Sequence, residues 1–327
     1  MKPPQGSAAL PACRIIDQLK PDFTAERASL IAGLLGSPAA ISPKYFYDDL
    51  GCALYGAICQ LPEYYPTRTE VHIFRTYRDE IADAAGQGKQ FVDLGAGDCC
   101  KAQSWIPFLM PARYIAVDIA APEIHRALTK MSVDFPEVEM LGVVTDFSRR
   151  LDLEGALGVQ PATFFYPGSS IGNFTPGDAI VFLGQIQSYC TARPGSGLMI
   201  GVDCKKGKPL LDAAYDDALG VTAAFNRNAL LHLNRVYGFD FDIAGFIHRG
   251  FYNEAQGRIE MHLEALRDQV VHLNGAARTF KTGERIHTEN SYKYDPEEFE
   301  SMLHEAGFSS VRLWCDAERS YSVFYAS

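Results

Sequence analysis

Residues 90–101 read QFVDLGAGDCCK, an apolar segment that ends abruptly at Gly95 and Gly97. The apolar half predicts a buried β-strand, and residues 100–109 predict a helix after the glycines. Because glycine has no Cβ, its backbone adopts positive φ and lets a ligand approach closely. No Gly-Lys-Ser/Thr follows, which excludes a P-loop. A strand that passes through a glycine turn into a helix N-terminus is where α/β folds bind nucleotide-like ligands.

Acidic residues follow the next two predicted strands. Residues 114–118 are apolar and end in Asp118, about 20 residues after the turn, where an acid can accept hydrogen bonds from both hydroxyls of a ribose. Asp146 follows a strand over residues 138–144, and the ring of Phe147 beside it can stack on a base. This order is typical of S-adenosylmethionine (SAM) methyltransferases. An NAD site on the same fold is the alternative from this region alone, because fold by itself does not decide function.

The chain alternates between strand and helix up to residue 203, which predicts a parallel sheet. The segment PGSSIGNFTP, residues 167–176, follows the strand over 162–166, and its small residues open space for a substrate beside the cofactor. Within it, Asn173 can both donate and accept hydrogen bonds, while Thr175 is better placed to cap the next helix.

The pattern changes after residue 205, where we expect an insertion with antiparallel strands over 246–252, 258–267 and 270–274. The final part returns to the core with a helix over 296–306 and a hairpin of 311–315 and 320–325. Elsewhere we expect a loose start over residues 1–12 and helices over 25–35, 70–85, 122–135, 178–191 and 210–219.

The composition argues against several classes of protein. The chain has 327 residues and a net charge of −10 without clusters of Lys and Arg, which makes it a poor candidate for binding nucleic acid or an anionic membrane. No apolar run approaches the ~18 residues of a membrane helix, and the N-terminus lacks an apolar signal-peptide core. The eight cysteines form no Cys-x-x-Cys pair, and the eight histidines show no metal-ligand spacing. We therefore expect a cytoplasmic protein with reduced thiols and no metal site.

Five tyrosines lie close together on segments rich in proline and glycine: Tyr45, Tyr47, Tyr55, Tyr64 and Tyr65. Tyrosines on such loops often line a pocket, with rings for packing and hydroxyls for hydrogen bonds. Aromatic packing beneath a loop is the alternative for any single one of them.

With these segments, the chain resembles the histidine-specific Nα-methyltransferases of ergothioneine biosynthesis, which convert L-histidine to its trimethyl betaine, hercynine. The motif VDLGAG (92–97) is shared by methyltransferases at large. The other segments that carry the resemblance span nearly the whole chain: PKYFYDDLG (43–51), LPEYYPTRTE (61–70), PGSSIGNFTP (167–176), AYDDALGVTAAFNRN (214–228), RIEM (258–261) and TENSYKY (288–294). The chain departs from the family at Tyr55, where Phe is expected, at Tyr166-Pro167, and at Asp98-Cys99-Cys100.

The resemblance implies an α/β fold: a Rossmann-like class I SAM methyltransferase core with a second, α+β domain that binds the substrate. The second domain is formed by the N-terminal segment and the insertion after the fifth strand. The SAM-binding domain then covers residues 69–203 and 293–327, and the substrate-recognition domain covers residues 1–68 and 204–292.

The resemblance also implies roles for individual residues. Tyr47 and Asn173 are candidates for orienting the reacting amine, and Asn173 and Tyr215 for holding the substrate carboxylate. Glu289 and Ser291 match the positions that bind the imidazole. The other substrate-side positions are Tyr64, Gly168, Thr222 and Met261, the last as a wall of the imidazole pocket. The cofactor-side positions are Gly95, Lys101, Asp118, Asp146 and Phe147, together with Gly97 of the glycine turn.

Methyl transfer to an amine needs a neutral nucleophile aligned with an already activated methyl group, and no metal. A buried Glu289 that accepts an imidazole N–H would reject Phe or Leu, because the carboxylate would be left unpaired. Read alone, Glu289 is equally well a surface partner of Lys293 at helical spacing.

The leading hypothesis is therefore SAM-dependent Nα-methylation of L-histidine, with S-adenosylhomocysteine (SAH) as the second product. The alternatives are another amino acid as substrate (tryptophan, tyrosine or a modified histidine), an NAD enzyme, or a non-catalytic binding module. We expect a free amino acid as the partner molecule, no nucleic acid, no membrane and a monomer.

Overall fold

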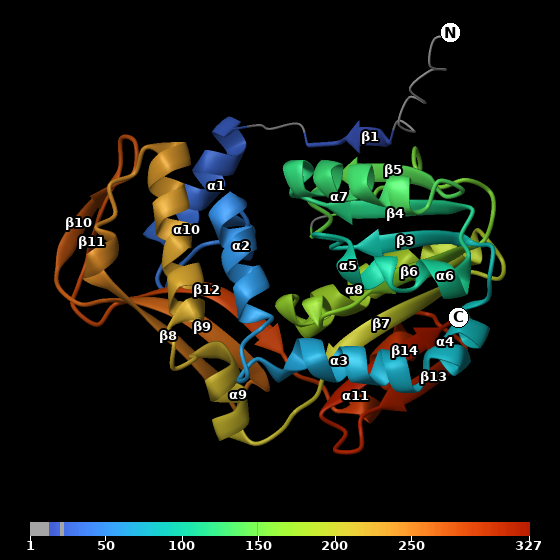
Figure 1. Ribbon diagram of the computed structural model, residues 1–327. Helices are drawn as coiled ribbons and strands as arrows, with labels where there is room; N and C mark the ends of the chain where they lie inside the picture. The colour runs from blue at the N-terminus through green and yellow to red at the C-terminus, as the bar shows by residue number, and fades with distance from the viewer. Residues whose placement is uncertain (1–12, 20–22, 149) are drawn as a thin grey trace, which may run out of the picture.

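The computed structural model describes residues 13–19, 23–148 and 150–327, and in it the chain forms two lobes (Figure 1). The predicted loose start over residues 1–12 lies outside the described residues. The larger lobe is built on an eight-stranded sheet in the order β1-β5-β4-β3-β6-β7-β14-β13. Its strands are β1 (Arg14–Asp17), β3 (Gln90–Leu94), β4 (Arg113–Asp118), β5 (Glu139–Val144), β6 (Ala162–Tyr166), β7 (Gly197–Asp203), β13 (Val311–Cys315) and β14 (Tyr321–Ala326).

The strands from β1 to β7 in this sheet run parallel, and β14 pairs antiparallel between β7 and β13. After β3 the chain moves through β4 to β5 and then returns to the other side of β3 with β6. In open α/β sheets, ligands bind at the carboxyl ends of the strands beside such a change of direction. The fold thus places the glycine turn after β3 and the loop after β6 next to each other.

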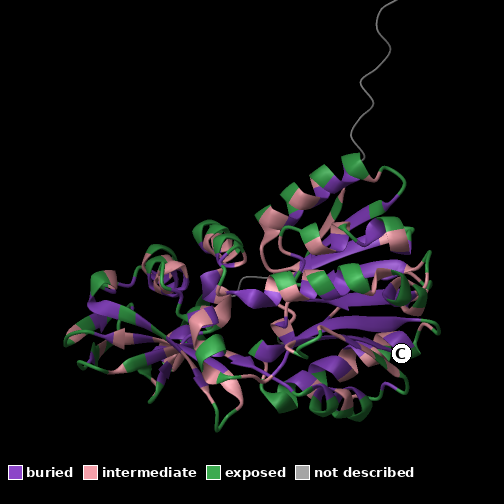
Figure 2. Cartoon of the chain, turned by 60° about the horizontal axis from the view of Figure 1, so that its bottom comes forward, coloured by how far each residue is buried: buried purple, intermediate pink, exposed green. Residues whose placement is uncertain are grey.

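Helices cover both faces of the large sheet. Successive residues of each strand point to opposite faces, and the apolar side chains on both faces need a covering layer. Phe91 packs on one face with α3–α7, and Val92 packs on the other with α8 and α11. The central strands are accordingly buried throughout, while the outer sides of the helices are exposed (Figure 2). These helices are α3 (Tyr65–Thr76), α4 (Arg78–Ala85), α5 (Cys100–Gln103), α6 (Ile106–Leu109), α7 (Ala121–Asp134), α8 (Pro176–Thr191) and α11 (Pro296–Glu305).

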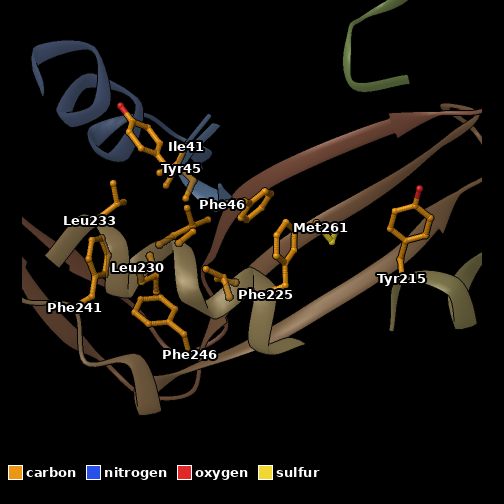
Figure 3. Packing of buried hydrophobic residues seen from close by; sticks show 14 of the residues in the cluster. Ile41, Tyr45, Phe46, Tyr215, Phe225, Leu230, Leu233, Phe241, Phe246 and Met261 are labelled. Carbon is orange, nitrogen blue, oxygen red and sulfur yellow. The ribbon is translucent and has the colours of Figure 1, made fainter. Parts of the chain in front are cut away.

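The smaller lobe has its own core around a four-stranded sheet in the order β2-β12-β9-β8. In this core the rings of Phe46 and Phe225 lie 4.7 Å apart, close to Met261 (Figure 3). The strands are β2 (Ala39–Ala40), β8 (Phe246–Asn253), β9 (Arg258–Ala265) and β12 (Arg285–Tyr292), with a separate hairpin of β10 (Gln269–His272) and β11 (Ala277–Phe280). The helices are α1 (Phe23–Leu35), α2 (Asp49–Ile58), α9 (Lys208–Tyr215) and α10 (Val221–Tyr237), with short 3₁₀ turns η1 (Pro43–Phe46) and η3 (Ile243–Gly245). A third 3₁₀ turn, η2 (Ser170–Asn173), follows β6 and packs with the core of the large sheet.

The predicted α/β class and the central strands are confirmed, and several elements differ. The helix predicted over 70–85 is two helices that break at Tyr77, and the helix predicted over 100–109 is divided into α5 and α6. The strand predicted over 270–274 pairs with β11 and not with β9. Strand β12 was missed, because Thr288, Glu289 and Ser291 among its buried residues are polar and interrupt the apolar alternation.

Strand β1 also departs from the prediction. It pairs in register with β5, from Arg14 opposite Leu141 to Asp17 opposite Val144, so residues 14–17 belong to the large sheet. The sequence had assigned residues 1–68 as a block to the substrate-recognition domain, and β1 is too short to give a pairing signal of its own. The rest of the predicted division stays a prediction. Among the described helices, none combines the length and the apolar character needed to span a bilayer.

Candidate active site

The glycine turn after β3 lies against the end of β4. Gly95 and Gly97 have φ of 70° and 51°, in the left-handed region that favours glycine. The Gly97 N–H donates to Asp118 Oδ2 at 2.9 Å, and the Ala120 N–H donates to Asp118 Oδ1 at 2.9 Å. No described atom lies within 4 Å of where a Cβ of Gly97 would be, so the turn faces open space. The predicted turn and the predicted ribose acid are thus brought together.

Asp146 and Phe147 follow β5 on the same edge of the sheet. Asp146 Oδ1 accepts from the Ser148 N–H at 3.2 Å, and Asp146 Oδ2 lies 3.8 Å from Lys44 Nζ. The Phe147 ring stacks on Phe182, with 5.7 Å between centroids. The edge therefore presents two carboxylates, an aromatic ring and a glycine turn, which is the donor and acceptor set that a nucleoside needs.

Glu70 on α3 connects this edge to the loop after β6. It is fully buried, and its Oε2 accepts from Lys101 Nζ at 2.6 Å. Its Oε1 accepts from the Gly168 N–H and the Tyr321 hydroxyl, both at 2.7 Å. Gly168 has φ of 77°, and a Cβ there would lie 3.1 Å from Lys101 Nζ. Sequence reasoning gave Glu70 no role, because one Glu on an amphipathic helix carries no signal of the contacts it makes.

All nine residues predicted for the substrate line one cavity between the lobes. It encloses about 530 Å³ of space free of protein atoms, its open mouth included, which suits a small ligand. The predicted lining residues are Tyr47, Tyr64, Gly168, Asn173, Tyr215, Thr222, Met261, Glu289 and Ser291. Six others were not among the predicted substrate residues, although Tyr55 was in the tyrosine group: Tyr55, Ile58, Ser169, Ser170, Ala214 and Phe225. Phe225 was missed because its segment was assigned no regular structure, whereas it lies inside α10.

Glu289 lies on β12 opposite Met261 of β9, directly after an irregularity in the pairing between His287 and Glu289. Its side chain is buried, and burial raises the pKa of the carboxyl to about 7, with the charge of Lys293 acting in the opposite direction. Lys293 itself pairs with Asp203 at 2.8 Å. The reading of Glu289 as an exposed partner of Lys293 on a helix is therefore wrong, since both are buried and Glu289 lies on a strand.

Neutral phenol rings form much of the cavity wall. Tyr47 packs edge-on against Tyr55 at 6.1 Å, and Tyr64 packs edge-on against Tyr215 at 6.0 Å. Burial, followed by the nearby charge of Glu289, raises the pKa of Tyr47 well above its usual value. Tyr47 therefore acts through a hydroxyl that keeps its proton and through its apolar ring. Asn173, in contrast, is exposed at the cavity mouth, and its amide has no hydrogen-bond partner within the described part of the chain.

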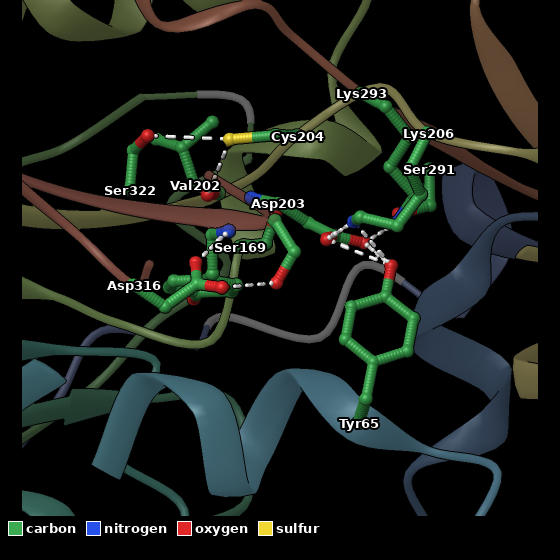
Figure 4. Close-up of polar contacts among 12 residues, drawn as sticks. Tyr65, Ser169, Val202, Asp203, Cys204, Lys206, Ser291, Lys293, Asp316 and Ser322 are labelled. Carbon is green, nitrogen blue, oxygen red and sulfur yellow. Dashed lines mark hydrogen bonds and ion pairs between the residues drawn. The ribbon is translucent and has the colours of Figure 1, made fainter. Parts of the chain in front are cut away.

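Behind the cavity lies a buried ionic cluster around Asp203 at the end of β7 (Figure 4). The Asp203 carboxylate accepts from the Tyr65 hydroxyl at 2.8 Å and pairs with Lys206 and Lys293. Burial opposes its ionisation, but the two lysines hold the pKa of Asp203 below its usual value. In the described residues, no group of three or more His, Cys, Asp or Glu side chains is arranged to hold a metal.

Comparisons with known proteins agree with this arrangement. Residues 26–327 match the model of a family described as SAM-dependent histidine-specific methyltransferases. A histidine N-alpha-methyltransferase of Mycolicibacterium smegmatis is 37% identical over 322 residues, 95% of this chain and 98% of that one. One of Mycobacterium tuberculosis is 35% identical over 307 residues, covering 92% and 94%. Ergothioneine biosynthesis protein 1 of Neurospora crassa is 29% identical over 287 residues, 85% of this chain and 32% of that longer protein.

Proposed function

Because the chain belongs to the family of SAM-dependent histidine-specific methyltransferases, we propose that it methylates the α-amino group of L-histidine up to the trimethyl betaine, hercynine, in ergothioneine biosynthesis. One observation carries the proposal. A single cavity gathers a buried carboxylate, Glu289, and the amine- and carboxylate-binding candidates, Tyr47, Asn173 and Tyr215. Its lining residue Gly168 shares the Glu70 carboxylate with Lys101 of the cofactor edge.

The edge of the large sheet fits the methyl donor. Asp118 accepts hydrogen bonds from two backbone N–H groups, and its carboxylate oxygens can still accept from the ribose hydroxyls. Asp146 and Phe147 would bind the base. The Lys101 ammonium has three N–H groups and donates one of them to Glu70. The other two could bind an acidic group of SAM. When bound, SAM supplies a methyl group already activated on a sulfonium.

The protein's own task is to bind and align the amine. An α-amino group has a pKa of roughly 8, and a somewhat higher one in a free amino acid, so a modest downward shift in the cavity is enough to make it a nucleophile. Burial keeps Tyr47 protonated, so its hydroxyl orients the amine by hydrogen bonding and is no anionic base. Asn173 can accept from the amine and donate to the carboxylate. Tyr215 lines the same cavity, and its hydroxyl proton goes to Ser291 in this structure. Holding the reactants in line accounts for the rate, since the methyl group needs no further activation.

The ring wall suits the products of successive transfers. Each methylation makes the nitrogen larger, and the third leaves a permanent cation that cannot lose its charge. Faces of Tyr and Phe rings attract such a cation, and Tyr47, Tyr55 and Phe225 lie within 5.8–6.2 Å of one another at this wall. A carboxylate beside the methylated α-nitrogen would instead form an ion pair with the product and hold it in the cavity.

A methyl-transfer assay across the free amino acids tests the proposal. The purified protein is incubated with SAM and each amino acid in turn, and products are identified by mass spectrometry. We expect mono-, di- and trimethylhistidine from L-histidine and little product from tryptophan, tyrosine or phenylalanine. If L-histidine gives no trimethylated product while another amino acid does, the proposed substrate is wrong. Binding of NAD without binding of SAH, measured by calorimetry, would refute the cofactor assignment.

A further inference from the structure

Lys293 is a buried cation directly behind the part of the cavity wall formed by Tyr215 and Ser291. Its side chain is 0% exposed, and its ammonium donates to Asp203 Oδ2 at 2.8 Å (Figure 4). It also donates to the Tyr215 hydroxyl at 2.9 Å and to Ser291 Oγ at 3.0 Å. A lysine ammonium has three N–H donors. All three are therefore in use, and two of them hold hydroxyls of the cavity.

The Ser291 hydroxyl has one proton to donate and two acceptor positions. Lys293 donates to one position, and the Tyr215 hydroxyl donates to the other at 3.2 Å. The proton of Ser291 is then left for a ligand in the cavity that Ser291 lines together with Glu289. In the arrangement of this structure, Ser291 offers a donor and an ionised Glu289 offers an acceptor.

We propose that Lys293 is a positioning residue, which fixes Ser291 as a hydrogen-bond donor to the unprotonated ring nitrogen of histidine while Glu289 accepts the ring N–H. This inference rests on the proposed function and deepens it. A neutral imidazole has one N–H and one acceptor nitrogen, and so satisfies both groups. An indole offers an N–H but no acceptor nitrogen, and would leave the Ser291 proton unpaired in a buried site.

A purely electrostatic role, in which Lys293 only neutralises buried Asp203, makes a different prediction. Lys206 pairs with the same carboxylate, and its side chain is only 10% exposed. Within the described residues, the hydrogen bonds of Lys206 go to Asp203 and Tyr65. Lys206 therefore neutralises Asp203 without holding a cavity hydroxyl, and is the matched control for Lys293. Burial alone would lower the pKa of Lys293, but Asp203 keeps it above its usual value, so the ammonium stays charged.

The experiment compares Lys293→Met, Lys206→Met and Ser291→Ala by calorimetry with L-histidine, in the presence of SAH so that no turnover occurs. We expect Lys293→Met to raise the Kd for histidine about tenfold, because a hydrogen-bond network to the ligand is lost. Lys206→Met should change this Kd less than about twofold. The Kd for SAH serves as the control for an intact cofactor site. In the Ser291→Ala background, Lys293→Met should have a clearly smaller effect than in the wild type, because the two residues act together.

Equal losses of histidine affinity in the two lysine variants would overturn the inference and leave the proposed function standing. So would fully additive effects of Lys293→Met and Ser291→Ala. If the wild type binds no histidine at all, the proposed function fails, and this inference fails with it. Should Lys293→Met not fold, the pair Asp203→Asn/Lys293→Met and Asp203→Asn/Lys206→Met makes the same comparison without a buried unpaired carboxylate.

Discussion

On β12, the side chain of Glu289 faces the cavity, and that of Glu260, on the neighbouring strand β9, pairs with Arg258 and His262. The two residues are a matched pair, because they lie on adjacent strands of one sheet and only Glu289 lines the cavity. We expect Glu289→Ala to lower kcat/KM for histidine about 10- to 100-fold, mostly through KM, because a charged hydrogen bond to the ring is lost. Selectivity for histidine over tryptophan and phenylalanine should fall with it.

Steady-state kinetics at pH 8, where Glu289 is ionised, measures this effect, with Glu260→Ala as the control. Glu260→Ala should affect stability more than KM, because its contacts are with Arg258, His262 and Asn253. An unchanged KM for histidine in Glu289→Ala would refute the role given to this carboxylate.

The pKa of Glu289 also predicts a pH dependence of stability. Burial raises this pKa from 4.5 to about 7, so the folded protein holds the proton more tightly than the unfolded chain. The stabilising contribution is complete below about pH 4.5 and is lost as the pH rises to about 7, at most about 3 kcal/mol. Glu289→Gln removes this dependence. In denaturant unfolding, the variant should therefore gain stability relative to the wild type between pH 5 and pH 8; a constant difference would contradict the assignment.

At the scale of elements, Glu70 joins α3 to the amino end of α5, the loop after β6 and strand β14. Glu70→Gln keeps the size of the side chain but places an amide where Lys101 and Gly168 need an acceptor. We expect the Kd for SAH to rise about tenfold and the free energy of unfolding to fall by about 2 kcal/mol.

Glu80→Gln on α4 is the matched control for this substitution. Glu80 is exposed, its carboxylate accepts from Trp314 Nε1 at 3.0 Å, and it does not line the cavity. Calorimetry with SAH and denaturant unfolding should separate the two variants. Identical behaviour of Glu70→Gln and Glu80→Gln would show that Glu70 does not organise the cofactor edge.

The same elements show what the sequence could predict. The glycine turn at Gly95, the acid at Asp118 and the central strands follow from local patterns, since a buried parallel strand is apolar throughout and ends at small residues. The cavity residues were found through the resemblance and not through periodicity. Strand β12 has a polar inner face with Thr288, Glu289 and Ser291, so the site itself removes the apolar alternation by which a strand is recognised.

Contacts between distant segments left no local pattern to read. Glu70 meets Gly168 and Tyr321 across separations of 98 and 251 residues, and Lys293 meets Tyr215 across 78. The pairing of such groups depends on the assembled fold, because their partners lie on elements that are distant along the chain. A sequence reading therefore paired Lys293 with Glu289, one helical turn away, whereas the fold pairs it with Asp203.

At the scale of the molecule, β1 ties the start of the chain to the large sheet, although α1 and η1 just after it belong to the smaller lobe. Ile15 packs with one core of the large sheet and Ile16 with the other. We therefore expect Ile15→Ser/Ile16→Ser to lower the melting temperature by several degrees, since two partly buried apolar side chains at an edge strand are lost. The KM for histidine should stay unchanged, because β1 contributes no side chain to the cavity.

Val159→Ser, at a site 89% exposed, controls for the substitution itself. A raised KM at an unchanged melting temperature would contradict this prediction, since it would mean that β1 supports the substrate site and not the stability of the large sheet.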